Sequence, residues 1–351
     1  MRIAIVGGGV AGALLAWRLS QRVRRVSLTI YTAGRPGRSD ASGASGGMVR
    51  GFEETPAACG QAAESLAEVY GSATLKDWTG YRETGSVYLM PGLSDRPDPV
   101  ATSLAMVEQA LPGSATVLGA AELTRRYPFR DLPRDSAAVV ERQAGYISPH
   151  RLRARVLAEL GSAGAAIDGC RVRAVTPGAG AAPQVALADG NVHGHDIVVL
   201  AAGAWTPGLL RCSRLPGQQM RTKHIQYSVC SGQVLGLGAF VDNTTGLYGR
   251  TWGPGSFLVG LPSERWNIDP GDVRPDPALR QAAVAYAQHR LGVRLRPVRT
   301  VASSDCFRPD GGLALRECAS GSAVFTFSAG SGGAAKTAIA ASRAAAEALS
   351  A

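Results

Sequence analysis

Two stretches of the chain repeat the same order of apolar and small residues. Residues 2–21 and residues 324–336 each read as an apolar run of strand type, then a group of glycines, then the start of an alanine-rich helix. A strand that breaks into glycines before a helix presents bare amide groups and a helix N-terminus to an anionic or electron-rich ligand. Two such turns, one near each end of the chain, predict one large cofactor held at both ends.

The pattern between these turns predicts an alternation of strands and helices followed by a more strand-rich region. Helices are predicted at 57–70, 100–110, 120–127, 149–162 and 276–291, the fourth opened by Ser148 as cap and Pro149 in the first turn. Strands are predicted at 26–31, 85–90, 165–175, 183–187, 223–229, 240–241, 246–249 and 256–261, with a buried strand from Asp196. We therefore expect an α/β fold in which a Rossmann-type nucleotide domain (1–84, 141–217 and 302–351) carries an inserted antiparallel α+β domain (85–140 and 218–301).

The first glycine turn fits a dinucleotide fingerprint better than a simple packing turn. Gly7, Gly9 and Gly12 follow a strand directly, and the helix after them spaces Leu14, Leu15 and Leu19 for burial. An acidic residue normally ends the second strand and binds the ribose hydroxyls, whereas this strand ends in Tyr31 and Thr32. A hydroxyl of Thr32 is a substitute for that carboxylate, and Arg35 or Arg38 is placed to approach the adenosine. Without the carboxylate, the sequence favours FAD over NAD.

Composition narrows the class of protein further. The chain has 351 residues, of which 45% are hydrophobic and 6% aromatic, as in ordinary two-domain enzymes. It contains no apolar stretch near 18 residues and begins on the nucleotide-binding strand, so we expect a cytoplasmic protein with no membrane partner. The net charge of +10 comes from arginines spread along the chain, which predicts a solvated surface and no nucleic-acid partner.

Cysteine and lysine usage adds two points. The six cysteines show no CxxC spacing, so neither a disulfide framework nor a metal site is expected. Only three lysines occur, Lys76, Lys223 and Lys336, in a chain that otherwise uses arginine. A lysine kept in such a chain points to a site that needs an ammonium group, and Lys336 lies just after the last glycines.

Several segments resemble the FAD-dependent amine and amino-acid oxidases of the D-amino-acid oxidase superfamily, which includes glycine oxidase and monomeric sarcosine oxidase. The matching segments occur in the family's order over nearly the whole chain, namely 7–12, 41–50, 145–149, 200–205, 307–311 and the closing glycine helix. The resemblance implies FAD as cofactor, with contacts at Gly7, Gly9, Val10, Ala11, Gly12, Thr32, Ser42, Ser45, Gly46, Gly47, Met48, Val172, Ala202, Gly203, Trp205, Cys306, Gly330, Gly332, Gly333 and Lys336.

The resemblance also implies a substrate site beside the flavin. Arg50 and Lys336 match the cations that bind the substrate carboxylate in the sarcosine-oxidase-like branch, and Arg308 matches the carboxylate-binding arginine of the glycine-oxidase-like branch. Cys306 lies where the first branch attaches its flavin covalently, although an ordinary buried thiol is the alternative. Tyr88, Tyr227, Tyr248 and Trp252 are expected to form pocket walls.

The predicted activity is oxidation of the C–N bond of a small amine, amino acid or cyclic imino acid to an imine, by hydride transfer to flavin N5. Such chemistry depends on positioning more than on an acid–base pair, so the lack of a histidine or carboxylate dyad does not argue against it. Reoxidation is expected through O₂, aided by Lys223 or His224, or through another acceptor. Two alternatives stay open at this point, a flavin-dependent monooxygenase and a non-catalytic flavoprotein subunit of a larger oxidase.

Overall fold

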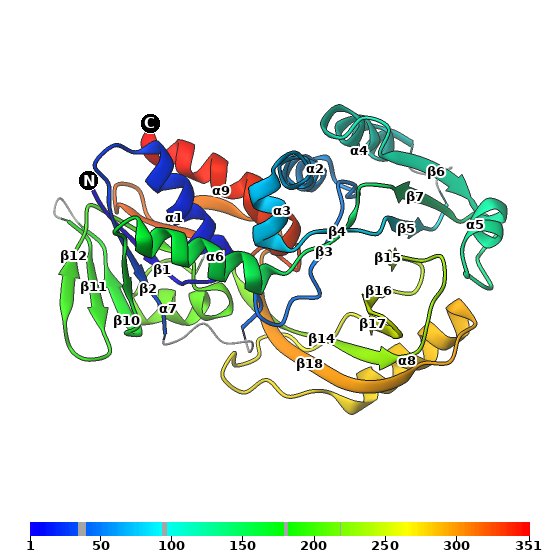
Figure 1. Cartoon of the computed structure of the whole chain (residues 1–351). Coiled ribbons are helices and arrows are strands. Elements are labelled where there is room, and N and C mark those ends of the chain that lie inside the picture. Colours follow the sequence, from blue (N-terminus) through cyan, green and yellow to red (C-terminus); the bar gives the residue numbers. More distant parts are fainter. Residues whose placement is uncertain (34–39, 93–96, 179–181, 218) are drawn as a thin grey trace.

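The computed structural model describes residues 1–33, 40–92, 97–178, 182–217 and 219–351. A six-stranded sheet forms the first part of the molecule, in the order β19 (Ala314–Glu317), β20 (Val324–Ser328), β13 (Ile197–Leu200), β1 (Arg2–Val6), β2 (Ser27–Tyr31) and β9 (Ala166–Asp168). All neighbouring pairs are parallel except β19 with β20. This is the predicted nucleotide-binding sheet, built from segments far apart in the sequence (Figure 1).

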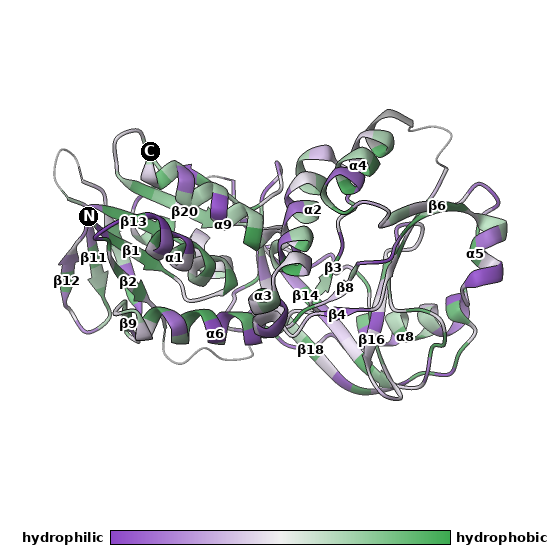
Figure 2. Ribbon diagram, turned by 45° about the horizontal axis from the view of Figure 1, so that its top comes forward, coloured by the Kyte–Doolittle hydropathy of each residue, from purple (hydrophilic) through white to green (hydrophobic). Residues whose placement is uncertain are grey.

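Helices α1 (Val10–Arg22), α6 (Pro149–Ser162) and α9 (Ala334–Ser350) cover one face of this sheet (Figure 1). Ile3 and Ile5 of β1 point into the core shared with these helices, while Ala4 and Val6 point into a second core on the opposite face. The alternation follows from the two-residue period of a strand that is buried on both sides. Figure 2 shows the resulting hydrophobic centre, with β1, β13 and β20 largely apolar.

The second part is an eight-stranded sheet, in the order β18 (Arg296–Phe307), β14 (Arg221–Ser231), β17 (Ser256–Gly260), β16 (Leu247–Gly253), β15 (Ala239–Asp242), β5 (Ser86–Met90), β7 (Ala137–Glu141) and β6 (Ala115–Gly119). The expected antiparallel sheet is thus a mixed one, because β5 and β15 pair in parallel. These two strands belong to separate segments of the chain. Because no hairpin joins them, they are free to pair in parallel.

One face of the eight-stranded sheet packs on α8 (Pro277–Leu291) and α5 (Ala120–Arg126), around Phe240 and Phe257. On the other face, α2 (Pro56–Gly71) and α4 (Pro97–Ala110) cover the part near β5 and β7. The remaining part of that face carries Tyr227, Val229 and Leu258. Between the two large sheets lies a small one, in the order β3 (Met48–Val49), β8 (Gly145–Tyr146) and β4 (Arg82–Glu83).

The predicted elements are largely confirmed, and the exceptions have local causes. Helix α6 begins at Pro149, and Ser148 caps it by accepting the Arg151 N–H. The single strand expected at 165–175 is two strands in different sheets, β9 and β10 (Val172–Thr176). The chain turns between them where the Asp168 carboxylate accepts the Cys170 N–H at 2.7 Å. Strand β10 instead forms a three-stranded sheet with β11 (Gln184–Leu187) and β12 (Val192–Gly194).

Short elements complete the fold, namely α3 (Ala73–Thr79), α7 (Thr206–Cys212) and a 3₁₀ turn at Gly203–Trp205. Strand β18 runs across the domain boundary expected at 301/302 and connects the eight-stranded sheet with the first part of the molecule (Figure 1). No helix in the described part of the chain is long and apolar enough to span a membrane.

Candidate active site

The four turns predicted to hold the cofactor follow four parallel strands of the six-stranded sheet. Gly7 follows β1, Thr32 follows β2, Ala202 comes after β13, and Gly330 comes after β20. Because parallel strands end at the same edge of a sheet, the fold gathers these segments along one edge. Two of the turns are in direct contact, since a Cβ on Gly7 would lie 2.3 Å from the Ala201 carbonyl oxygen.

The glycines of the first turn have distinct structural roles. Gly7 has a φ of +123° and no room for a side chain, and a Cβ on Gly12 would lie 2.1 Å from the Gly7 carbonyl oxygen. At Gly9, which caps α1, the nearest atom to such a Cβ is Ser42 Oγ at 3.4 Å. Gly7 and Gly12 therefore permit close packing, whereas Gly9 leaves open space beside the helix N-terminus, where Val10 and Ala11 begin the helix. This arrangement fits the phosphates of a dinucleotide.

The loop before β3 is held in place from several sides. Ser42 Oγ accepts the Val10 N–H at 3.0 Å, and Ser45 Oγ accepts the Gly47 N–H at 3.0 Å. Gly47 has a φ of +67°, and its carbonyl accepts the Ile147 N–H at 2.8 Å. The loop thus presents its polar groups from a fixed backbone that leads into Met48 of β3.

An ion pair between a buried arginine and a partly exposed aspartate anchors the same loop to α6. Arg153, which is almost fully buried, binds Asp40 at 2.6 Å, and Asp40 also accepts the Gly43 N–H at 2.8 Å. Since Gly43 is adjacent to Ser42, this pair positions the residue that meets the start of α1.

The closing glycine turn is tied to β18. The Gly332 N–H donates to Asp305 Oδ2 at 3.0 Å, and the Ser331 N–H donates to the Cys306 carbonyl at 3.1 Å. Burial raises the pKa of Asp305, although the amide groups of Cys306 and Gly332 oppose that shift. Gly330 and Gly333 complete the turn just before α9 begins. The Gly333 N–H donates to the Gly330 carbonyl at 2.7 Å.

Arg50 and Lys336 come together, as the resemblance implies, but they meet around a carboxylate of the protein. Glu53 Oε1 lies 2.9 Å from Arg50 Nη2, and the same oxygen pairs with Lys336 Nζ. Burial alone would raise the pKa of Glu53, but the two cations outweigh it, so this pKa lies below its ordinary value. Burial and the nearby Arg50 lower the pKa of Lys336. The sequence analysis missed Glu53, for which the spacing of three residues from Arg50 was the available signal.

Aromatic side chains lie on the face of the eight-stranded sheet that also carries Leu258. The strand register brings Tyr248 opposite Gly260. The tyrosine ring lies over that glycine, since a Cβ added to Gly260 would lie 2.3 Å from Tyr248 Cζ. Tyr248 donates its hydroxyl hydrogen to the Gln226 carbonyl at 2.7 Å. Tyr227 and Trp252 contact each other with ring centroids 5.9 Å apart. The Arg50 guanidinium lies 4.6 Å from the ring centroid of Tyr88, and the role of these aromatic residues as pocket walls stays a prediction.

A second residue that the sequence analysis missed is Arg250. It lies in β16, is 5% exposed, and donates from Nε to the Gly46 carbonyl at 2.6 Å. Its guanidinium lies 4.0 Å from the ring centroid of Tyr146 and 4.5 Å from that of Trp252. The available signal was one arginine between the aromatic residues of a strand. Arg250 thereby connects the aromatic face with the predicted cofactor loop.

A family model for FAD dependent oxidoreductases, known as DAO, matches residues 2–348. The chain belongs to this family. The resemblance seen in the motifs is confirmed, the protein is an oxidoreductase, and its cofactor is FAD. No curated protein sequence matches the chain.

Solved structures of other proteins share the fold. L-proline dehydrogenase from P. horikoshii matches with a TM-score of 0.82 and 16% identity, over 99% of this chain and 92% of that one. Glycine oxidase from Geobacillus kaustophilus matches with a TM-score of 0.78 and 19% identity, over 99% and 95%. NikD, described as an unusual amino acid oxidase essential for nikkomycin biosynthesis, matches with a TM-score of 0.76 and 20% identity, over 98% and 92%.

Cys306, the expected point of covalent FAD attachment, is fully buried in an apolar cluster with Met220 and Val324. Burial raises the pKa of its thiol to about 12. Flavin attachment needs a reactive thiolate, and this environment disfavours one. The environment of Cys306 therefore favours the alternative of an ordinary buried thiol.

Arg308 is paired within its own loop. Its Nε lies 2.8 Å from Asp310 Oδ1, and its backbone N–H donates to Ser331 Oγ at 3.2 Å. This salt bridge joins two residues of the same loop, and the role of Arg308 in carboxylate binding stays a prediction.

The other predicted FAD contacts are placed as follows. Thr32 is buried, and its hydroxyl donates to the Asp168 carbonyl at 3.3 Å. Val172 lies in β10, Gly203 has a φ of +53°, and Trp205 is 38% exposed. Arg35 and Arg38 lie outside the described residues. These contacts, too, stay predictions.

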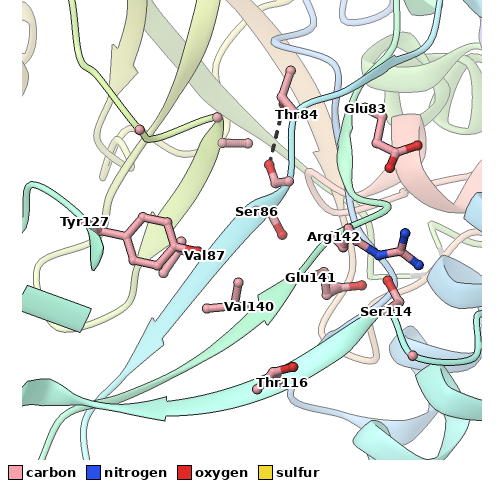
Figure 3. A pocket seen from close by; sticks show the side chains of 15 residues that line it. Glu83, Thr84, Ser86, Val87, Ser114, Thr116, Tyr127, Val140, Glu141 and Arg142 are labelled. Carbon is pink, nitrogen blue, oxygen red and sulfur yellow. Dashed lines mark hydrogen bonds between the residues drawn. The ribbon is translucent and has the colours of Figure 1, made fainter. Parts of the chain in front are cut away.

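A cavity of about 510 Å³ lies elsewhere, at the ends of β5, β6 and β7 (Figure 3). Ser114, Glu141 and Arg142 are among its lining residues, as is Tyr127 on the other side, and none of the predicted site residues lines it. Glu141 nevertheless connects it with the site, because its carboxylate accepts the Gly51 N–H at 2.8 Å and the Phe52 N–H at 3.1 Å.

Proposed function

We propose that this FAD-dependent oxidoreductase oxidises the C–N bond of a small amino acid, imino acid or amine to an imine. The observation that supports it most is the position of the Gly46 loop, which faces the aromatic side of the eight-stranded sheet through the Arg250 contact. The similar structures named as glycine oxidase and amino acid oxidase agree with this substrate class.

FAD would lie along the sheet edge, with its phosphates at Gly9 and Val10 and its ring system near Gly46, Gly47 and Gly332. When bound, it supplies the acceptor for the hydride that leaves the substrate carbon. The substrate nitrogen loses one proton to solvent, so the product is an imine that water can hydrolyse.

The residues of this chain contribute binding and exclusion of water. Tyr227, Trp252 and Leu258 offer an apolar wall, which shields the reacting C–H bond and favours a neutral amine. Glu53 is engaged by two cations, so it is held as a charged anchor and does not act as a free base. The protein therefore promotes the reaction mainly by positioning the substrate and excluding water.

Lys223 is better placed than His224 to aid reoxidation of the flavin. Its ammonium lies 4.5 Å from the ring centroid of Trp266 and 5.7 Å from that of Phe307, and Phe307 adjoins the Gly332 turn. His224 is buried and engages the Arg274 carbonyl at 3.1 Å. O₂ or another acceptor would then receive the electrons near Lys223.

The test is reduction of the bound flavin. Purified holoenzyme is mixed without oxygen with single amino acids, cyclic imino acids and amines, and bleaching of the flavin absorption band is recorded together with the imine or its hydrolysis product. Bleaching with matching product supports the proposal. A holoenzyme that no such compound reduces would favour the non-catalytic subunit, and NADPH-dependent incorporation of oxygen would favour the monooxygenase. Air or an artificial acceptor, added afterwards, identifies the oxidant.

A further inference from the structure

The closing glycine turn, residues 329–333, has an unusual backbone. Ala329 and Ser331 have φ angles of +66° and +49°, and Gly332 has a φ of +79°. For a residue other than glycine this left-handed conformation is strained, because its Cβ comes too close to a carbonyl oxygen. In no other turn of the described chain do two non-glycine residues with a positive φ lie two positions apart. Such strain persists only where the surrounding structure enforces it, and it concentrates at functional sites.

Hydrogen bonds from the end of β18 hold the turn in this conformation. The Gly332 N–H donates to Asp305 Oδ2 at 3.0 Å, and the Ser331 N–H donates to the Cys306 carbonyl at 3.1 Å. The Arg308 N–H, just after the strand, donates to Ser331 Oγ at 3.2 Å. Of these bonds, only the first uses a side chain of β18. Asp305 is therefore the residue of this strand whose substitution would loosen the turn.

The carboxylate of Asp305 is itself fixed. Its Oδ1 accepts the Cys306 N–H at 2.8 Å, so one oxygen is bound to the strand and the other to the turn. Burial raises the pKa of this carboxyl, which means that the folded protein disfavours its charge. The ionisation of Asp305 therefore opposes folding at neutral pH, in contrast to that of Glu53. A carboxylate kept in such a place calls for a role other than stability.

The turn that Asp305 holds lies where the cofactor is expected. Gly330, Gly332 and Gly333 are predicted FAD contacts, and Gly333 caps α9, so the turn determines where the first amide groups of that helix point. The nearest atom to a Cβ added to Gly332 is Phe307 Cζ, at 3.6 Å. The described residues thus leave space beside the turn for a ligand.

We propose that Asp305 is a positioning residue for FAD, which keeps the closing turn in its strained, left-handed form before the cofactor binds. Without this carboxylate the turn would relax, and FAD binding would have to restore the strained form. FAD affinity would then fall. The stability of the FAD-free chain would change little, because relief of the strain and of a buried charge offsets the lost hydrogen bonds. This inference rests on the placement of FAD in the proposed function, but not on the substrate.

The test measures FAD binding by the whole chain. Holoenzyme is diluted stepwise, and the fluorescence of released FAD gives the dissociation constant. We expect Asp305→Ala to raise this constant about 10-fold, while the urea midpoint of the FAD-free protein stays close to that of the wild type. Asp305→Asn keeps one acceptor oxygen and should raise the constant less. Asp189→Ala is the matched control, because Asp189 accepts the Asn191 N–H at 3.0 Å between β11 and β12, and it should leave FAD binding unchanged.

A second substitution tests the strain directly. Glycine adopts a positive φ without strain, so Ala329→Gly should make the left-handed form of the turn easier to reach. In the Asp305→Ala background, this change should recover most of the lost FAD affinity. On its own, Ala329→Gly should bind FAD at least as tightly as the wild type does.

Three results would overturn the proposal. In the first, Asp305→Ala binds FAD as the wild type does. In the second, this variant loses FAD affinity and Ala329→Gly recovers none of it, as expected if the carboxylate acts on the flavin through its charge. In the third, Asp305→Ala loses stability and keeps its FAD affinity, as expected of a merely structural hydrogen bond.

The measurements also separate this proposal from the proposed function, because none of them involves a substrate. Weakened FAD binding in Asp305→Ala, in an enzyme that no amino acid or amine reduces, would refute the function alone. Unchanged FAD binding in Asp305→Ala, in an enzyme that amino acids do reduce, would refute the role of Asp305 alone.

Discussion

Glu53 is the residue on which the cationic side of the site depends. Removing its charge leaves Arg50 and Lys336 close together in a buried place, and breaking such a group typically costs about 3–5 kcal/mol. We expect Glu53→Gln to lower the free energy of unfolding by an amount in this range, measured by urea denaturation. Glu64→Gln is the control, because Glu64 pairs with Arg343 at the exposed surface and its loss should cost less than about 1 kcal/mol.

The charge of Glu53 should also make the stability of the protein depend on pH. The pKa of Glu53 in the folded protein lies below its ordinary value of 4.5, so the unfolded chain binds more protons as the pH falls. The stability contributed by its charge is therefore complete above about pH 4.5 and is lost as the pH falls through the folded pKa. Unfolding measured from neutral to acidic pH should show the gap between wild type and Glu53→Gln narrowing in acid. A gap that stays constant over this range would contradict the assigned charge.

Cys306 gives a direct test of how FAD is attached. A thiol with a pKa near 12 in an apolar cluster is almost entirely protonated at neutral pH, and a protonated thiol is a poor nucleophile. We therefore expect acid precipitation of the yellow protein to release the flavin into the supernatant, from wild type and from Cys306→Ala alike. Flavin retained in the wild-type pellet and lost from Cys306→Ala would establish the covalent link instead.

At the scale of elements, two glycines of the first turn are needed for different reasons: Gly12 for close packing of the protein and Gly9 for space beside the cofactor. A methyl group on Gly12 would collide with the Gly7 carbonyl, and such overpacking typically costs about 1–3 kcal/mol. Gly9 has room for a methyl group within the protein, so Gly9→Ala should change apoprotein stability by less than about 0.5 kcal/mol.

The two variants are compared by urea denaturation of the apoprotein and by FAD titration. Gly12→Ala should lower both stability and FAD affinity, whereas Gly9→Ala should lower FAD affinity alone, because its methyl group occupies the space left for the phosphates. Full stability in Gly12→Ala, or wild-type FAD affinity in Gly9→Ala, would show that these roles are wrongly divided.

The sequence could predict the elements that are determined by residues close together in the chain, but not those that depend on contacts between distant segments. The glycine turns and the cap of α6 are local, since strand pattern, glycine spacing and a Ser-Pro pair lie within a few residues. The parallel pairing of β5 with β15 joins segments about 150 residues apart, and no local pattern records it. Glu53 and Arg250 were missed because one decisive partner of each, Lys336 for Glu53 and the Gly46 carbonyl for Arg250, comes from a distant part of the chain. Burial of Arg250 depends on the register of β16, which one sequence does not fix.

At the scale of the whole molecule, the site is formed where the two large sheets approach each other. Strand β18 belongs to the eight-stranded sheet and also holds the closing glycine turn through Asp305. Arg250 reaches from the same sheet to the Gly46 loop. Cofactor segments and pocket wall are thus connected at two places, so movement of the second sheet would change the FAD environment directly.

Glu141 forms a third connection, and it can be tested separately. It is fully buried at the end of β7, and its carboxylate accepts the backbone N–H groups of Gly51 and Phe52, which follow Arg50. Burial raises the pKa of Glu141, although these amides and Arg50 oppose the shift. In Glu141→Leu both amides would be left buried without an acceptor, at a cost of about 1–3 kcal/mol each. Glu141→Gln keeps one acceptor oxygen and should lose about half as much stability.

The two variants should also differ in FAD affinity, because the released backbone would carry Arg50 and Glu53 away from Lys336. We expect Glu141→Leu to lower both the urea midpoint and FAD affinity, and Glu141→Gln to show the same changes at smaller size. Denaturation of apoprotein and holoprotein, together with FAD titration, measures both effects. If Glu141→Leu lowered stability and left FAD affinity as in the wild type, the carboxylate would support the second sheet without positioning the site. A graded loss of both quantities would instead place Glu141 in the connection through which the eight-stranded sheet orders the cofactor loop.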